Sequence, residues 1–284
     1  MADLRFEKMH GCGNDYIYID CFTQQVEDPA ALAVRLSDRH KGIGGDGVIL
    51  VCPPEDPEND GRMRMFNLDG SEGKMCGNGI RCVAKFLYDH GYARRPALLI
   101  ETLSGVKTCT IHAENGLCTA VTVDMGPAIL DPARIPVDLP GESVIAREVE
   151  IAGGEPQAIT CVSMGNPHCV IFQQTDPMLL DLPAIGPRFE HDPLFPESVN
   201  TEFIRVLDDH TLQMRVWERG SGETMACGTG ACASAVAAVL NGYCPKGEPI
   251  TVRLRGGDLT VTYTDETVLM TGEAVTVFTG AVAL

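Results

Sequence analysis

Two stretches of the chain repeat each other without gaps, and this duplication constrains the fold more than any other feature. Residues 66–91 read FNLDGSEGKMCGNGIRCVAKFLYDHG, and residues 217–242 read WERGSGETMACGTGACASAVAAVLNG. Cys76 then corresponds to Cys227, at an offset of 151 residues. A spacing this long is far beyond the period of a solenoid repeat. The chain is therefore predicted to consist of two homologous halves.

A second, independent pair of segments supports the same division. Asn14 and Asn166 each follow a glycine and precede a strand-like run, at an offset of 152 residues. Two elements that repeat in register indicate duplicated domains. We expect an N-terminal half made of residues 1–123 plus 273–284 and a C-terminal half made of residues 124–272.

Short alternating or β-branched runs, separated by turn residues, predict a chain that is mainly strand. They occupy residues 16–19, 48–51, 97–102, 108–111, 119–123, 160–163, 169–172, 202–206, 212–217, 251–254, 259–263 and 275–278. One helix is predicted over residues 29–39, and two more should begin at Cys76 and Cys227. Gly91 and Gly242 suit the left-handed caps that end such helices. The fold class is α/β, of the α+β type.

The charge balance excludes several classes of protein. Lys and Arg total 22 and Asp and Glu total 39, which gives a net charge of −17. So acidic a surface repels nucleic acid. The apolar run 231–240 is about half of the roughly 20 residues that a membrane span needs, and residues 1–7 contain no apolar signal core. We expect a cytoplasmic protein that binds neither nucleic acid nor membrane.

The chain contains 12 cysteines, and their spacing decides what they indicate. No C-x-x-C occurs, which disfavours a zinc site or a thioredoxin-like site. Disulfide frameworks belong to short secreted domains. Cys109, Cys118, Cys161 and Cys169 lie among apolar residues and are interpreted as small buried hydrophobic side chains. No bound metal is expected.

The duplicated cysteine motif places a thiol where a helix begins. Helix N-termini carry a partial positive charge and N–H groups without an intrahelical partner. Such a position favours a thiolate, and the amides beside it can bind a carboxylate. The amides of this cradle are those of Gly77, Asn78, Gly228 and Thr229.

Two such thiols suit inversion of an acidic carbon. One thiolate removes the proton α to a carboxylate while the opposite thiol delivers a proton to the other face. Helix amides stabilise the charge that develops on the carboxylate. The predicted reaction is racemisation or epimerisation.

Several multi-residue motifs resemble the diaminopimelate epimerase family. They are Asn67-Leu68-Asp69-Gly70-Ser71, Met75-Cys76-Gly77-Asn78-Gly79, Glu218-Arg219-Gly220, Ala226-Cys227-Gly228-Thr229-Gly230, Gly13-Asn14-Asp15 and Gly165-Asn166-Pro167-His168. The resemblance implies two pseudo-symmetric domains, each a curved, mainly antiparallel sheet wrapped around a central helix, with the site in the cleft between them. It also implies a homodimer that interconverts LL- and meso-diaminopimelate without a cofactor, for lysine and peptidoglycan synthesis.

The same resemblance implies a role for each matching residue. Cys76 and Cys227 would be the two catalytic bases, and His168 and Glu218 would tune the thiols. The implied substrate contacts, besides the carboxylate cradle, are Asn14, Asn67, Asn166, Asn200, Glu218 and Arg219. The chain departs from the family at Gly47, where many members have Gln, and Cys12 has no evident role.

Three alternatives remain open at this stage. The first is a related two-cysteine racemase or isomerase of another small acid. The second is an acyl-transfer hydrolase that pairs one cysteine with His168, although this leaves the duplicate cysteine unexplained. The third is a protein that buffers metal ions or uses its thiols structurally.

Overall fold

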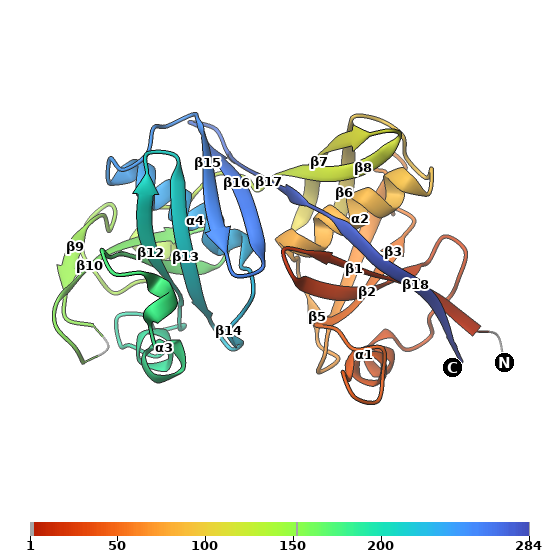
Figure 1. Ribbon diagram of the computed structural model, residues 1–284, viewed down its shortest axis with the longest axis horizontal. Helices are drawn as coiled ribbons and strands as arrows, with labels where there is room; N and C mark the ends of the chain where they lie inside the picture. Colours follow the sequence, from red (N-terminus) through yellow and green to blue (C-terminus); the bar gives the residue numbers. More distant parts are fainter. Residues whose placement is uncertain (1–2, 152, 284) are drawn as a thin grey trace. The chain divides into compact units, whose positions relative to one another are not determined.

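The computed structural model describes residues 3–151 and 153–283, and the chain divides into two compact units. Unit 1 runs to Asp124 and resumes at Thr271, and unit 2 is Met125–Met270. These boundaries lie one or two residues from those expected from the sequence. Figure 1 shows that strands predominate in both units. None of the helices in the described part of the chain is long and apolar enough to cross a membrane.

Unit 1 is a mixed sheet that packs against a central helix. Its elements are β1 (Asp3–Gly11), β2 (Asn14–Asp20), α1 (Pro29–Ser37), β3 (Gly47–Cys52), β4 (Gly61–Asn67), β5 (Glu72–Gly73), α2 (Gly77–Asp89), β6 (Ala97–Thr102), β7 (Gly105–Glu114), β8 (Leu117–Asp124) and β18 (Val275–Ala283). Neighbouring strands are antiparallel except for two pairs, β2 with β3 and β4 with β6. Helix α2 packs against β8, β1 and β2.

Unit 2 repeats this topology. Its elements are η1 (Pro132–Arg134), β9 (Arg147–Val149), β10 (Gln157–Ser163), β11 (Pro167–Phe172), η2 (Pro177–Leu179), α3 (Leu182–Glu190), β12 (Asn200–Asp208), β13 (Thr211–Glu218), β14 (Gly222–Glu223), α4 (Gly228–Leu240), β15 (Pro249–Leu254) and β16 (Gly257–Tyr263). The parallel pairs are β11 with β12 and β13 with β15, at the places equivalent to those in unit 1. Helix α4 packs against β16 and β10. A further strand, β17 (Val268–Glu273), lies where the chain returns to unit 1.

The strand register fixes which residues of the two units are equivalent. In unit 1, Ile17 of β2 pairs with Val48 of β3. In unit 2, Cys169 of β11 pairs with Thr201 of β12. The duplication observed in the sequence is thus a duplication of strand pairing as well.

The core explains most of the cysteines. Cys109, Cys118, Cys161 and Cys169 are at most 1% exposed, so their interpretation as buried apolar side chains is confirmed. Cys161 and Cys169 are direct partners across β10 and β11. All 12 cysteines lie within the described residues and are free thiols.

Candidate active site

The two duplicated cysteines occupy the same position on their helices. Cys76 is the N-cap of α2, and its Sγ accepts a hydrogen bond from the Gly79 N–H at 3.3 Å. Cys227 is the N-cap of α4, and its Sγ accepts from the Gly230 N–H at 3.4 Å. In most helices the N-cap acceptor is a side-chain oxygen of Ser, Thr, Asp or Asn, and here the cysteine sulfur takes that place. The prediction that both helices begin at these cysteines is confirmed.

The helix ends were also predicted correctly. Helix α2 stops at Asp89 and is followed by Gly91 at φ +79°, while α4 stops at Leu240 and is followed by Gly242 at φ +75°. Both glycines adopt the left-handed conformation that closes a helix.

In unit 1, an amide and a carboxylate orient the Cys76 thiol. Asn14 Oδ1 accepts from Cys76 Sγ at 3.2 Å and from Asn78 Nδ2 at 3.5 Å. Asn14 Nδ2 donates to Asp46 Oδ2 at 2.7 Å, which fixes the direction in which the amide points. The structure therefore brings the predicted residues Asn14, Cys76 and Asn78 together, with Asp46 behind them.

Asp46 is itself part of a charged network. Arg39 bonds to both Asp15 and Asp46, at 2.6 and 2.9 Å. Lys8, whose side chain is 8% exposed, pairs with Asp15 at 2.5 Å. These cations offset the charge of the two carboxylates and hold the loop that carries Asp46 against β2.

Asn67, by contrast, makes local bonds at the end of β4. Its Nδ2 donates to Ser71 Oγ at 3.0 Å, within the turn that leads to β5. Gly47 is its partner across β3 and β4. A Cβ at Gly47 would lie 2.2 Å from the Phe66 carbonyl oxygen, so this backbone accepts no side chain without moving. The glycine that departs from the family pattern is therefore required by local packing.

In unit 2, a second and different cluster surrounds Cys227. Asn166 Nδ2 lies 3.2 Å from Thr229 Oγ1, and Thr229 Oγ1 lies 3.5 Å from Cys227 Sγ. Asn166 Oδ1 lies 3.1 Å from His168 Nε2. The predicted residues Asn166, His168, Thr229 and Cys227 thus form one connected chain.

Burial dominates the acid–base properties of this second cluster. Cys227 is 5% exposed, and burial raises the pKa of its thiol well above the usual range. The Glu218 and Glu202 carboxylates raise it further, while hydrogen bonds from Thr229 and Gly230 oppose them. Burial also raises the pKa of Glu218, against a hydrogen bond from Thr224.

Asn200 and Arg219 form a separate pair beside this cluster. Asn200 Nδ2 donates to the Pro167 carbonyl at 2.7 Å, and Asn200 Oδ1 accepts from the Arg219 N–H at 2.9 Å. Both the nitrogen and the oxygen of the Asn200 side-chain amide therefore form hydrogen bonds with backbone groups. The Arg219 side chain is exposed and donates to the Glu197 carbonyl at 2.9 Å.

Two residues of these clusters are not among those predicted from the sequence. Asp46 lies in a glycine-rich stretch, directly before Gly47. Glu202 opens a predicted strand, and its carboxylate lies 2.7 Å from His168 Nδ1. The signal that could have found Glu202 is a carboxylate directly before the apolar residues Phe203 and Ile204 of a predicted strand.

The position of His168 bears on the hydrolase alternative. Its two ring nitrogens face Glu202 and Asn166, and Cys227 is not a hydrogen-bond partner of either. A thiol–imidazole pair of the kind that a cysteine hydrolase uses is therefore not formed here. Among residues 3–151 and 153–283, no three or more His, Cys, Asp or Glu side chains are grouped as metal ligands would be.

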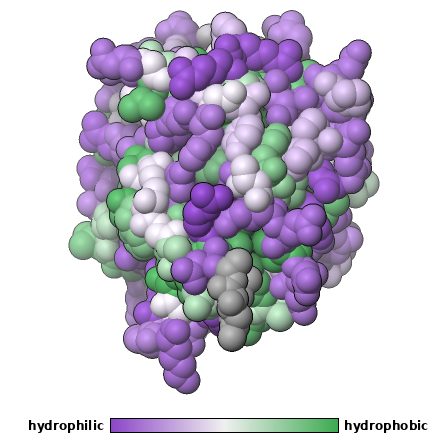
Figure 2. All heavy atoms as spheres, turned by 90° about the vertical axis from the view of Figure 1, so that its right-hand side faces the viewer, coloured by the Kyte–Doolittle hydropathy of each residue, from purple (hydrophilic) through white to green (hydrophobic). Residues whose placement is uncertain are grey.

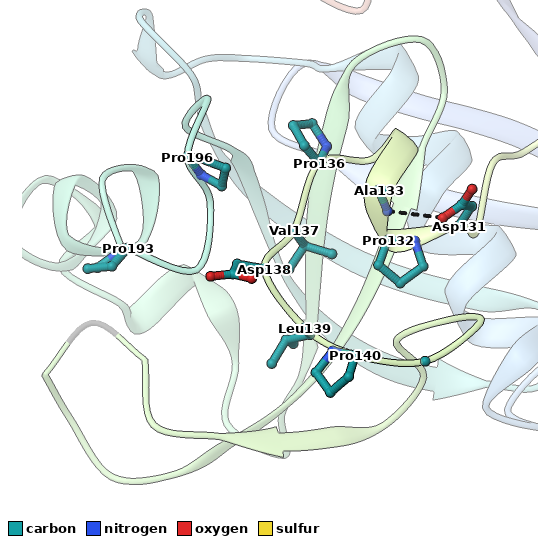
Figure 3. A pocket seen from close by; sticks show the side chains of 11 residues that line it. Asp131, Pro132, Ala133, Pro136, Val137, Asp138, Leu139, Pro140, Pro193 and Pro196 are labelled. Carbon is teal, nitrogen blue, oxygen red and sulfur yellow. Dashed lines mark hydrogen bonds between the residues drawn. The ribbon is translucent and has the colours of Figure 1, made fainter.

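A surface pocket of about 450 Å³ lies elsewhere in unit 2 (Figure 3). Proline rings and short side chains surround it: Asp131, Pro132, Ala133, Pro136, Val137, Asp138, Leu139, Pro140, Gly141, Pro193 and Pro196. None of the predicted site residues lines this pocket.

Comparison with known proteins agrees with the motifs in the sequence. The family model for diaminopimelate epimerase matches residues 6–130 and 160–277. The chain belongs to the diaminopimelate epimerase family. Members of this family are isomerases.

Relatives of similar length support this membership. The diaminopimelate epimerase of Acetivibrio thermocellus is 50% identical over 283 residues, covering 99% of both chains. That of Desulfovibrio desulfuricans is 52% identical over 285 residues, covering 98% of this chain and 97% of its own.

Solved structures of lower identity share the fold. A probable proline racemase from Agrobacterium radiobacter has a TM-score of 0.72 at 16% identity, covering 99% of this chain and 93% of its own. A PhzF-family phenazine biosynthesis protein from Bacillus anthracis has a TM-score of 0.70 at 16% identity and covers both chains completely. The predicted fold class, two α/β domains with curved sheets around central helices, is confirmed.

Proposed function

We propose that this protein interconverts LL- and meso-diaminopimelate by transferring protons at one α-carbon between two cysteines, Cys76 and Cys227. The observation that carries the proposal is the matched position of the two thiols. Each is the N-cap of a helix, and each sulfur accepts a hydrogen bond from the backbone amide three residues later. Membership of the diaminopimelate epimerase family supports the choice of substrate.

The proposed reaction needs no electron acceptor. A cysteine thiolate forms an S–H bond as the α C–H bond breaks, and the electron pair moves onto the α-carboxylate. The second cysteine then gives its proton to the opposite face of the carbon. Positioned acid–base groups contribute roughly 10²–10⁴-fold, and the remaining stabilisation must come from donors aimed at the carboxylate.

The first amides of α2 and α4 are the proposed donors. Gly77 and Asn78 begin α2, and Gly228 and Thr229 begin α4. Amides at these positions have no carbonyl partner within their own helix, and the helix dipole favours an anion beside them. They would hold the reacting carboxylate as its charge increases.

The remaining predicted residues would recognise the distal amino-acid group of the substrate. Arg219 suits a carboxylate and Glu218 suits an ammonium group. Asn200 would act indirectly, because its amide already holds the Arg219 backbone. The proposed contacts from amide side chains are then those of Asn14, Asn67 and Asn166.

The cellular context follows from the family and remains part of the proposal. The reaction would proceed without pyridoxal phosphate or metal, in the cytoplasm, and would serve lysine and peptidoglycan synthesis. The active form would be a homodimer, and the substrate is a small molecule.

Solvent isotope exchange tests the proposed reaction. The protein is incubated with LL-diaminopimelate in deuterium oxide without added cofactor, and α-deuterium and stereochemistry are followed by NMR. The expected product is meso-diaminopimelate that carries deuterium at the inverted carbon. Unlabelled product, or activity that is lost on dialysis and restored by pyridoxal phosphate, would contradict the proposal.

Paired cysteine variants test the two bases. Cys76→Ala and Cys227→Ala should each lower the rate of epimerisation at least 10³-fold, because each removes one proton carrier. Cys82→Ala and Cys232→Ala are matched controls, since these buried thiols lie further along the same two helices. If either N-cap variant turned over at a near-normal rate, the two-base scheme would be wrong.

A further inference from the structure

Two cysteines outside the proposed active site lie side by side where β2 and β3 end. The parallel register of these strands pairs Asp20 with Val51. The Cys21 N–H donates to the Val51 carbonyl at 2.8 Å, which continues the parallel ladder by one residue. Cys21 therefore lies opposite Cys52, the last residue of β3.

The two side chains also lie on the same face of the sheet. Alternate residues of a strand point to one face, and Ile19 of β2 and Leu50 of β3 are register partners in the core of unit 1. Cys52 belongs to the same core cluster, and Cys21 packs against it. The two thiols form a hydrogen bond with each other. Neighbouring strands are about 4.7–4.9 Å apart, which is within the Cα–Cα range of about 4.4–6.8 Å found in disulfides.

The two thiols differ in acidity. Arg62 is the partner of Cys52 across β3 and β4. The hydrogen bond with Cys21 lowers the pKa of the Cys52 thiol, and the Arg62 and Arg64 charges lower it further against the effect of burial. The hydrogen bond with Cys52 and burial both raise the pKa of the Cys21 thiol. Cys52 is therefore the more acidic thiol of the pair, and Cys21 is the one that keeps its proton.

The duplicated fold does not require thiols at this place. In unit 2 the Gln173 N–H donates to the Ile204 carbonyl at 2.8 Å, the contact equivalent to that of Cys21 in unit 1. Gln173 and Arg205 therefore occupy the positions that correspond to Cys21 and Cys52. The same strand pairing is formed there by two residues that cannot be cross-linked.

We propose that Cys21 and Cys52 are a modification site, which hydrogen peroxide oxidises to a disulfide that joins the end of β2 to the end of β3. Neither residue belongs to the machinery of the proposed function, so this inference goes beyond that function and does not depend on it. Cys21 is partly exposed and Cys52 is 7% exposed, so the pair lies at the edge of the core. An acidic thiol beside a second, resolving thiol is typical of cysteines that are oxidised reversibly.

The proposed oxidation takes place in two steps. The Cys52 thiolate attacks one oxygen of hydrogen peroxide, so that an S–O bond forms as the O–O bond breaks, and the hydroxide that leaves takes a proton from solvent. Cys52 is then a sulfenic acid. The Cys21 sulfur next attacks the Cys52 sulfur, the S–O bond breaks, and the hydroxyl leaves with the Cys21 proton as water. Two electrons pass from the two sulfurs to the peroxide, and one disulfide forms.

Peptide mapping of the full-length protein tests the site. Reduced protein is treated with a small excess of hydrogen peroxide, free thiols are alkylated, and tryptic peptides are analysed by mass spectrometry. The peptide of residues 9–35, which contains Cys21, should be cross-linked to that of residues 42–62, which contains Cys52. Fragment ions distinguish Cys21 from Cys12, and dithiothreitol should remove the cross-link. A Cys52 that stays free, or is oxidised without the cross-link, would overturn the proposal even if no variant folds.

Cys161 and Cys169 are the matched control within the same chain. They are partners across β10 and β11 and form a hydrogen bond with each other, but both are 0% exposed. They should stay reduced under conditions that close the pair in unit 1. If both pairs closed at the same rate, proximity alone would explain the disulfide, and a specific site at Cys21 and Cys52 would be excluded.

Serine variants test the order of the two steps. In Cys21→Ser the sulfenic acid at Cys52 has no resolving thiol, so dimedone, which traps sulfenic acids, should label Cys52 after peroxide treatment. In Cys52→Ser the less acidic Cys21 should take up little dimedone. Labelling in the reverse pattern would contradict the roles assigned to the two sulfurs.

An arginine variant tests the contribution of the neighbouring charge. Arg62→Gln should slow disulfide formation several-fold, because loss of the cation leaves less of Cys52 as thiolate. Arg253→Gln is the matched control, since it removes the same charge from an exposed position in unit 2. Equal rates in the two variants would contradict the role of Arg62. None of these measurements uses turnover, so they distinguish failure of this site from failure of the proposed epimerase function.

Discussion

At the scale of single residues, burial has the largest effect on the pKa values of Glu218 and Cys227 in unit 2. Glu218 and Cys227 lie close together, and burial is the largest cause of the raised pKa of each. The Glu218 charge further raises the pKa of the Cys227 thiol, whereas a hydrogen bond with Cys227 lowers the pKa of Glu218. The free protein therefore favours the protonated forms of Glu218 and Cys227, and in the proposed two-base scheme Cys227 would be a thiol that supplies a proton.

The raised pKa of Glu218 predicts a pH-dependent cost to folding. The folded state binds the Glu218 proton more tightly than the unfolded state, so this group contributes stability at low pH that is lost as pH rises through the folded pKa. Glu218→Gln should therefore unfold at higher urea than the wild type at pH 8. The difference, on the order of 1 kcal/mol, should vanish below about pH 4, near the ordinary Glu pKa. Equal midpoints at pH 8 would contradict this reading.

At the scale of elements, helices α2 and α4 each have a cysteine as N-cap and a glycine three residues after it. Gly79 and Gly230 donate to the sulfur and also face the strand beneath. The sequence predicted both helices but not α3, because that helix contains Pro183, Gly186 and Pro187. A Cβ at Gly186 would lie 2.2 Å from the Trp217 ring, so α3 is held by contact with β13 and not by helix propensity.

Alanine at the two equivalent glycines should have unequal effects. In Gly79→Ala the new methyl meets the ends of the flexible Ile49 and Met63 side chains, and alanine gains about 1 kcal/mol in helix propensity. Its free energy of unfolding should change by less than about 1 kcal/mol. In Gly230→Ala the methyl meets the Glu202 carboxylate, which His168 holds in place. Gly230→Ala should lower the free energy of unfolding by roughly 1–3 kcal/mol, as measured by urea unfolding. Equal losses in the two variants would contradict the prediction that the two glycines differ.

At the scale of the whole molecule, the fold is one strand arrangement used twice, with the C-terminal strand β18 added to the first copy through β1. Figure 2 shows a mainly hydrophilic face with smaller hydrophobic areas. Val277 and Phe278 of β18 are 55% and 46% exposed, although Phe278 contacts Phe6 edge to face. Large apolar side chains that are exposed to solvent on a strand are candidates for a protein–protein interface.

The proposed homodimer can be tested at these two residues. If β18 supplies the interface, Val277→Ser with Phe278→Ser should shift the mass measured by light scattering from two chains of 30.5 kDa towards one. Leu179→Ser is the control, because Leu179 is 78% exposed in unit 2. A monomeric wild-type protein would exclude the homodimer, and a dimer unaffected by the double variant would exclude β18 as its interface.

The sequence by itself determined the duplication, the two cysteine-capped helices and the glycines that end them, because these depend on residues close together in the chain. Strands β1 and β4 were not predicted, since neither is an unbroken β-branched run and each is stabilised by its neighbours in the sheet. Only the tertiary structure decided that Asp46 orients Asn14 and that Glu202 lies beside His168. These contacts join residues more than 30 positions apart, and the pairing of segments that are distant in the chain determines which side chains meet.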